Sequence, residues 1–355
     1  MSTDQTITAN QKCEMCQGNM VFDASQQVLI CQKCGNTILV TEQASDVEKS
    51  FHDLLINAPK WQKEASVFQC QHCGAKSVIS KFDIVAACDY CGAENVNEIQ
   101  EIPGVRPDTV VLFALSKEDA HAKAQTWLSK RFFVPNDFKQ LAVSRPLHGV
   151  YFPAFNFDAQ TSTRYHGVQV LTKTVSTVID GETVTSSQDI RHPLRGFDKH
   201  IFDDLLVLAN QAMTPKMLKS LQPFDTKKGK TFQQAYISGF GVSQASTDPT
   251  QAWEDAKKLM EEVVRAKIIK QHSGVHIENL QLDMGITNVT YKYVLLPVYI
   301  SHTEYKGAKY KLCVNGQTGK VYCKTPKSRW KIFSFFATTF ALCATGLGIV
   351  LAMCL

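Results

Sequence analysis

The chain has 355 residues, a formal net charge of +5, 44% hydrophobic residues and 20% charged residues. This length can bury a large core, and the composition excludes an intrinsically disordered protein and a membrane protein with many spans. The N-terminal stretch MSTDQTITANQKCEMC lacks the apolar core of a secretory signal. We therefore expect the first 330 residues to stay in the cytoplasm.

Eight of the 12 cysteines fall into two copies of one frame, Cys-x2-Cys-x14-Cys-x2-Cys. The first copy contains Cys13, Cys16, Cys31 and Cys34, and the second contains Cys70, Cys73, Cys88 and Cys91. The cytoplasm keeps thiols reduced, and two Cys-x2-Cys knuckles supply four thiolates that converge on zinc at ~2.3 Å. The identical spacing predicts two zinc ribbons, over residues 1–36 and 70–100, with one structural Zn2+ in each.

Two other chemistries use cysteine pairs. A redox dithiol usually occurs once, in a βαβ context, and an iron–sulfur cluster does not predict two evenly spaced ribbons with short strands between the knuckles. His72 could replace one cysteine ligand, although a surface position suits it better. Four cysteine ligands close the coordination shell, so the predicted metal is structural and not catalytic.

The charge of the ribbon region argues against nucleic acid. Residues 1–100 contain seven lysines, no arginine and twelve acidic residues, a net charge of −5. Each zinc bound by four thiolates adds −2, so the region approaches −9, which repels a phosphate backbone. Residues 101–355 carry +10, so we expect acidic ribbons that project away from a basic end of the molecule.

Between the ribbons, residues 37–69 form a predicted linker with a short helix over 46–55. A body of residues 101–325 follows. Its first helix is predicted to start at Ser116, the first residue of a Ser-x-x-Asp capping box, and to run through Leu128. Its second helix is predicted to start after Asp248, because the next residue is a proline in the first helical position.

Each of these helices precedes a proline-containing strand, over 151–157 and over 295–300. Tyr165-His-Gly167 and Tyr305-Lys-Gly307 then occupy parallel positions, which favours an internal duplication of a helix plus an antiparallel meander. Asp180-Gly181 and Asn315-Gly316 are typical of hairpin turns. The predicted fold class is α+β, with an antiparallel sheet in the body.

No local catalytic motif emerges, and we expect the chain not to be an enzyme. Residues 314–320, Val-Asn-Gly-Gln-Thr-Gly-Lys, suggest a phosphate loop, but only two residues separate the glycines and valine follows the lysine. A turn between strands explains this segment better. Cys313 and Cys323 flank the turn and could face each other across it as packed, reduced thiols.

Residues 332–355 are 24 residues without a charge, which as a helix would reach roughly 36 Å, enough for the hydrocarbon core of a bilayer. Basic residues stand directly before them: Lys324, Lys327, Arg329 and Lys331. Such residues flank the cytoplasmic side of a span. The pattern predicts one C-terminal transmembrane helix, in a single-pass, tail-anchored protein of the bacterial inner membrane with its body in the cytoplasm.

The combination resembles a bacterial family of membrane-anchored tandem zinc-ribbon proteins. The resemblance rests on the two ribbons, the strands at 149–153 and 295–298, the segment 314–320 and Pro326-Lys-Ser328 before the apolar tail. Members are often labelled as carrying a transcription-factor-IIB-type ribbon or as primosomal protein N-prime-like. The resemblance implies association with SPFH-domain or phage-shock-protein-A-like membrane proteins, and it carries over only the eight zinc cysteines.

Three functions follow from these patterns. The leading hypothesis is a membrane-anchored cytoplasmic adaptor that recruits or organises membrane-associated protein assemblies through its zinc ribbons. The alternatives are a nucleic-acid-binding zinc-ribbon protein tethered to the membrane, which the acidic ribbons disfavour, and an enzyme with an unrecognised site in the body. No small-molecule substrate is indicated.

Overall fold

The structure is a computed structural model that describes residues 12–40, 48–52, 65–72, 74–80, 88, 93, 96–99, 106–179, 182–210 and 212–339. Strands dominate these residues, and three of the strands are unusually long. They are β9 (His148–Ile179), β10 (Glu182–Leu208) and β13 (His276–Tyr305). Strands of about six residues are the norm, so these elements set the shape of the molecule.

Each ribbon contributes a small antiparallel sheet. The first sheet has the order β1 (Met20–Asp23), β2 (Val28–Cys31), β3 (Thr37–Leu39). The second has the order β6 (Lys76–Ser80), β5 (Ala65–Cys70), β7 (Val96–Ile99). In β1, Met20 and Phe22 are buried and alternate with partly exposed residues, as expected for a sheet that packs on one face.

The main sheet has the order β10, β9, β13, β14 (Ala308–Asn315), β15 (Val321–Cys323), with all four neighbouring pairs antiparallel. Short strands add to its sides: β4 (Lys49–Ser50), β8 (Thr109–Val110), β11 (Lys230–Thr231) and β12 (Gly241–Val242). Ile179 of β9 pairs with Glu182 of β10, so the chain reverses between them, as the Asp-Gly dipeptide predicts. Residues 180–181 themselves lie outside the described residues.

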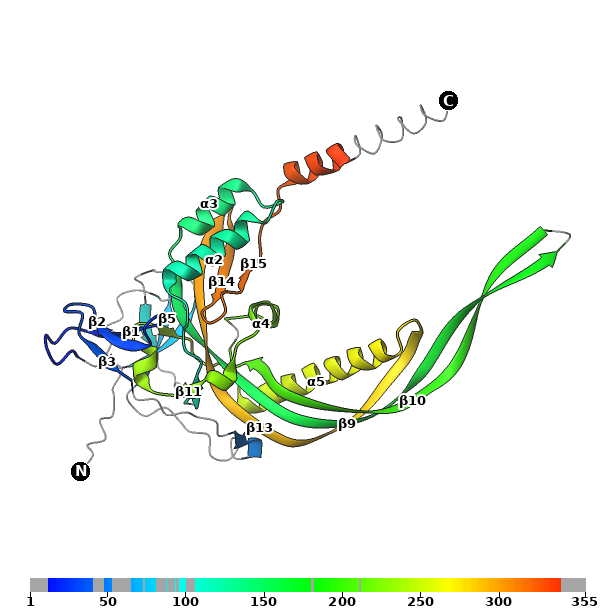
Figure 1. The fold of residues 1–355 in the computed structure, drawn as a ribbon, viewed down its shortest axis with the longest axis horizontal. Coiled ribbons are helices and arrows are strands. Elements are labelled where there is room, and N and C mark those ends of the chain that lie inside the picture. The colour runs from blue at the N-terminus through cyan, green and yellow to red at the C-terminus, as the bar shows by residue number, and fades with distance from the viewer. Residues whose placement is uncertain are drawn as a thin grey trace.

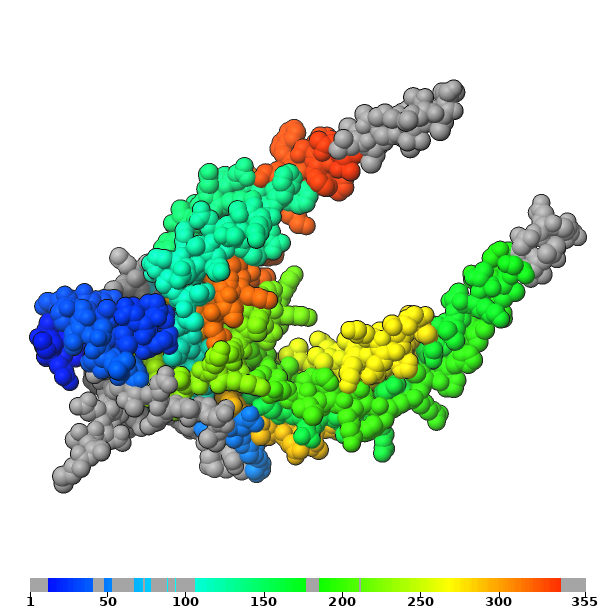
Figure 2. Space-filling view, in the orientation of Figure 1, coloured from blue at the N-terminus to red at the C-terminus, as the bar shows by residue number. Residues whose placement is uncertain are grey.

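The sheet divides into a base and an arm (Figure 1). The base consists of residues 148–157 of β9, residues 291–305 of β13, β14 and β15. The arm consists of the rest of β9, the rest of β13 and the whole of β10. These strands curve away from the base, and α5 (Pro249–Gln271) lies along one face of them. Figure 2 shows the result as an open, C-shaped molecule with the arm on one side of a wide hollow.

Helices cover both faces of the base. On one face lie α2 (Lys117–Ser129) and α3 (Asn136–Ser144), and on the other lies α4 (Pro215–Leu221). The Ser116 hydroxyl accepts a hydrogen bond from the backbone N–H of Asp119 at 3.0 Å, which confirms the predicted start of α2. Short 3-10 helices, η1 (Thr226–Lys228) and η2 (Gln234–Ile237), lie in the connection between α4 and α5.

The start of α5 is also confirmed, because the Asp248 carboxylate accepts a hydrogen bond from Thr250 N–H and Pro249 occupies the first turn. Its buried residues recur at every fourth position: Ala252, Ala256, Met260, Val264 and Ile268. This stripe packs on Phe155, Phe157 and Tyr165 of β9 and forms the core of the arm. Val263 and Ala266, which lie outside this stripe, are exposed.

The predicted α+β fold class needs correction, because the body is dominated by long strands and is not a duplicated helix plus meander. Lys306 and Gly307 form the tight turn between β13 and β14, where both have positive φ. The supposedly equivalent His166 and Gly167 lie within β9, where both pair with β10 and His166 also pairs with β13. The two Tyr-containing segments therefore have different structures. The predicted helix over 46–55 is also wrong in part, since Lys49 and Ser50 form β4.

The prediction of a membrane-spanning helix is likewise corrected. Within the residues that the structure describes, no helix is both long and apolar enough to cross a membrane. The chain is helical over 329–339, and residues 340–355, the larger part of the predicted span, lie outside the described residues. The predicted tail anchor, the single-span membrane partner and the inner-membrane location all rested on that helix, so the structure does not support them.

Candidate metal centre

The first cysteine frame forms a compact cluster of four sulfur atoms. The Sγ atoms of Cys13, Cys16, Cys31 and Cys34 all lie within 4.8 Å of one another. Two of the distances, Cys13 to Cys34 and Cys16 to Cys31, are 3.5 Å. A tetrahedral site with Zn–S bonds of ~2.3 Å requires sulfur atoms about 3.8 Å apart. The arrangement is therefore compatible with one zinc ion.

Backbone hydrogen bonds fix each knuckle of this cluster. The N–H of Cys13 donates to the carbonyl of Gly18 at 2.9 Å, and the N–H of Cys31 donates to the carbonyl of Asn36 at 2.8 Å. Gly18 is required because a Cβ there would lie 2.9 Å from the Cys31 sulfur, inside the space of the ligands. Gly35 has a φ of +75°, which glycine adopts without strain.

The knuckle that contains Cys31 also favours the thiolate form of this cysteine, which is the form that binds zinc. The backbone N–H of Cys34, followed by that of Lys33, lowers the pKa of the Cys31 thiol to about 6, against the opposing effect of its burial. Asn36 donates from its side-chain amide toward Cys13 Sγ at 3.8 Å. At Cys34 the N–H of Asn36 acts in the same direction, but the sulfurs of Cys16 and Cys13 outweigh it and raise the pKa of that thiol to about 12, so zinc binding would have to displace its proton.

The second frame is described only in part. Cys70 and Cys88 are buried, whereas Cys73 and Cys91 lie outside the described residues. The N–H of Cys70 donates to the carbonyl of Ala75, and that of Cys88 donates to the carbonyl of Ala93. In each case the cysteine N–H donates to the carbonyl five residues later, as in both knuckles of the first ribbon. Gly74, with a φ of +72°, occupies the position of Gly35.

The ribbons do not stand apart from the body but pack on opposite faces of the base. Met20 and Phe22 of the first ribbon share one core with Tyr151 of β9. Cys70 and Cys88 of the second share the other core with Phe152, the next residue along the strand. Successive residues of a strand point to opposite faces, so the sheet separates the two ribbons.

One segment, residues 234–244, contacts both ribbons; we call it the linking segment. At its start, Ser238 accepts from Phe22 N–H through its carbonyl and donates from its hydroxyl to the Met20 carbonyl at 2.8 Å. At its end, Gln244 N–H donates to the Lys76 carbonyl of the second ribbon. Between these contacts, β12 pairs in parallel with β9. Sequence reasoning missed this segment because its only signal is the unremarkable Gly-Phe-Gly at 239–241.

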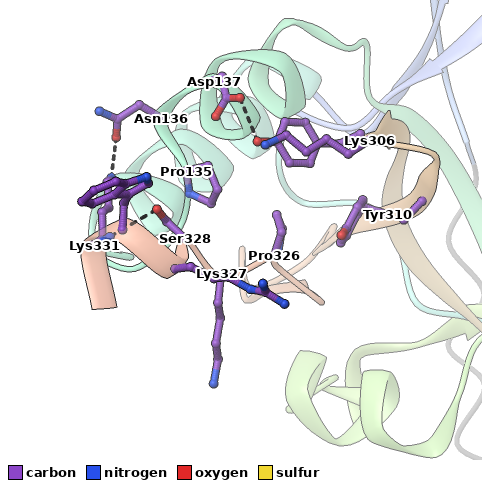
Figure 3. A pocket seen from close by; sticks show the side chains of 13 residues that line it. Pro135, Asn136, Asp137, Lys306, Tyr310, Pro326, Lys327, Ser328 and Lys331 are labelled. Atoms are coloured by element: carbon purple, nitrogen blue, oxygen red, sulfur yellow. Dashed lines mark hydrogen bonds between the residues drawn. The ribbon is translucent and has the colours of Figure 1, made fainter. Parts of the chain in front are cut away.

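Three of the four basic residues predicted to flank a membrane span line a surface pocket of about 540 Å3 (Figure 3). Lys327, Arg329 and Lys331 lie there beside the start of α3 and the β13–β14 turn. Lys331 donates to the Val134 carbonyl and to Asn136 Oδ1, so it joins the C-terminal helix to the loop before α3. Lys324 is exposed and does not line this pocket.

Cys313 and Cys323 are both free and buried, but they do not face each other as expected. Cys313 pairs with Tyr322 and Cys323 pairs with Leu312, so the two thiols point to opposite faces of the sheet. Burial raises the pKa of each thiol to about 12. They act as small core residues in separate hydrophobic clusters.

The fold places a tetracysteine cluster that is compatible with one zinc ion against the core of a larger, sheet-based body. No family model and no solved structure matches the chain. Among curated proteins, it is similar to the Bacillus subtilis (strain 168) protein named "Uncharacterized protein YdjG". The two are 25% identical over 232 residues, which cover 65% of this chain and 67% of that protein. The resemblance to the tandem zinc-ribbon family stays a prediction.

Proposed function

We propose that this chain is a non-enzymatic adaptor in which two zinc ribbons stabilise the base and the arm binds an acidic protein. The second zinc ion belongs to this proposal. It is supported by the matching knuckle hydrogen bonds of Cys70 and Cys88 and by the identical spacing of the two cysteine frames. Because both ribbons pack into the base, zinc acts on the stability of the sheet and the ribbon surfaces are not the main contact.

The observation that carries the proposal is the outer face of the arm, on the side opposite α5. Phe197 is 54% exposed and Ile201 is 71% exposed, both on β10. No other strand pairs with the free edge of β10 within the part of the chain that the structure describes. Large apolar side chains gathered on one exposed strand are typical of a protein contact surface.

The charge around this surface indicates what kind of partner fits. Arg195 and Lys199 are exposed on β10 beside Phe197, and Lys199 Nζ lies 5.9 Å from the centre of the Phe197 ring. Arg164 is exposed on β9 directly opposite Phe197, and Asp283 of β13 is opposite Arg164. The apolar centre thus has a mainly basic border, which complements an acidic surface with an apolar centre.

Photo-crosslinking tests the proposal. A photoreactive amino acid is placed at position 197 or, as a matched control, at exposed position 269 of α5, and the full chain is expressed in its own cells. We expect a discrete protein adduct from position 197 and none from position 269. The charge reversals Arg195→Glu and Lys199→Glu should together reduce that adduct about tenfold or more.

An adduct that persists after charge reversal, or that forms equally from position 269, would contradict the assignment of this face. Binding of single-stranded oligonucleotides at low salt, lost in the same charge-reversal variant, would instead support the nucleic-acid alternative. Phosphates would then occupy the basic border, and a salt-dependent affinity would distinguish this result from protein binding.

A further inference from the structure

A second group of ionisable residues lies where the arm meets the base, away from the cysteines. The ladder between β9 and β10 is interrupted between Phe202 and Leu205, and this bulge inserts Asp203 and Asp204. Asp204 has a φ of 63°, and its backbone N–H donates to Asp158 Oδ1 of β9 at 2.6 Å. The carboxylates of Asp158, Asp203 and Asp204 offer oxygen atoms that all lie within 4.8 Å of one another.

The negative charge of these three aspartates is only partly balanced by nearby lysines. Glu48 adds a fourth carboxylate near Asp158. Partial burial, followed by the charges of Glu48 and Asp204, raises the pKa of Asp158 to about 6, although the N–H of Asp204 donates to it. Lys227 Nζ lies 2.9 Å from Asp203 and 3.9 Å from Asp204, but its side chain is 67% exposed and free to move into solvent. Lys292 approaches Glu48 at 3.5 Å.

A buried amide beside this group is a separate observation that points to cation binding. Asn156 is 1% exposed, and its side-chain amide donates to Asp204 Oδ1. The carbonyl oxygen of the same amide, Oδ1, is buried and has no hydrogen-bond partner. A buried polar atom of this kind usually contacts protein, water or an ion. The amide that carries it contacts Asp204, one of the three carboxylates, and an uncharged amide oxygen is a frequent ligand of Ca2+.

We infer that Asp158, Asp203, Asp204 and Asn156 Oδ1 form a binding site for a hard divalent cation, with Ca2+ the best match. All four donors are oxygen atoms, which suit Ca2+ and Mg2+ and not the thiolate-preferring zinc of the ribbons. The donors come from β9 and from the bulge of β10, and Ca2+ accepts such irregular geometry more readily than Mg2+ does. The bound cation displaces Lys227, offsets two of the three negative charges and joins residues 156–158 of β9 to the bulge of β10.

Titration calorimetry on the zinc-loaded chain, freed of other divalent cations by gel filtration, tests this site. We expect CaCl2 to bind at one site per chain and to raise the melting temperature, and MgCl2 to bind more weakly. Asp203→Asn and Asp158→Asn should each lower the Ca2+ affinity about tenfold or more, because each removes one charged ligand. Asp283→Asn, on the same arm but outside the group, should bind as the wild type does.

Loss of Ca2+ affinity in a variant can be distinguished from failure of that variant to fold. The Asp203 side chain is 63% exposed, so the Asp203→Asn variant should fold, and circular dichroism in metal-free buffer checks that it does. Absence of binding heat and of any melting shift at millimolar CaCl2 and MgCl2 would overturn the inference. Equal loss of affinity in Asp203→Asn and Asp283→Asn would also overturn it, because the effect would then be one of net charge.

Discussion

The hydroxyl of Ser238 donates a hydrogen bond to the backbone carbonyl of Met20 at 2.8 Å, across 218 positions of the chain. This contact seats the first ribbon on the linking segment. The next residue, Gly239, approaches the ribbon so closely that a Cβ built on it would lie 2.2 Å from Val21 Cγ1. The junction between ribbon and body is therefore a tightly packed surface.

Gly239→Ala should destabilise the chain by about 2–3 kcal/mol, since φ is +84° and the added methyl also meets Val21. Gly274→Ala is the matched control, because φ is +96° there and nothing lies within 4 Å. It should cost only about 1 kcal/mol. Urea unfolding measures the stability of both variants. Equal losses of stability would show that the junction accommodates the added methyl group.

Cys31→Ser should lower the zinc content from two ions per chain to one. The remaining three thiolates no longer close a tetrahedral shell, and a hydroxyl is a poor zinc ligand. Atomic absorption on purified protein measures the content, and Cys323→Ala, a cysteine outside both frames, serves as control. Two zinc ions per chain in Cys31→Ser, or only one in the wild type, would contradict the two-zinc proposal.

Asn315→Ala should cost about 2–4 kcal/mol. The fully buried amide donates to the carbonyls of Leu221 and Pro223 and accepts from the N–H groups of Gln317 and Thr318. Its removal leaves buried backbone groups without partners. Thr318→Ala, which truncates an exposed side chain of the same turn, should change stability by less than about 0.5 kcal/mol. Similar melting temperatures for the two variants would refute this role.

Asp158→Asn should alter how stability depends on pH in metal-free buffer. The folded pKa of Asp158, about 6, lies above its ordinary value of 3.8, so between these pH values the native state holds a proton that the unfolded chain has released. The wild type therefore loses stability as pH rises from about 4 to 6, and the loss persists above pH 6. Allowing for solvent screening, the variant should gain about 1 kcal/mol relative to wild type as pH rises from about 4 to about 6, and it should keep this gain above pH 6. Parallel pH curves would rule this out.

Local signals predicted local structure well. The four sulfurs of the first ribbon converge because each knuckle is a short loop that cysteine spacing and glycine largely determine. Ser116 and Asp248 predict helix starts for the same reason, since a cap acts within one turn. None of these features depends on residues far away in the chain.

Long-range features could not be predicted in the same way. Residues 158–179 of β9 are rich in Thr, Ser and Gln, and nothing in this stretch shows that it pairs with β10 and β13 over such a length. Asp203 and Asp204 suggest an element start, whereas a bulge places them beside Asp158 from another strand. The pairing of strands that are distant in the sequence determines both the length of β9 and the position of this bulge.

The position of the linking segment also has a consequence for synthesis. The first ribbon leaves the ribosome early, and its cysteines can collect zinc at once. Its apolar residues Met20 and Phe22, however, find their core only after residues 232–242 and β13 have been translated. During that interval the ribbon exposes a hydrophobic face, which makes the nascent chain dependent on chaperones or on rapid completion of the last third of the protein.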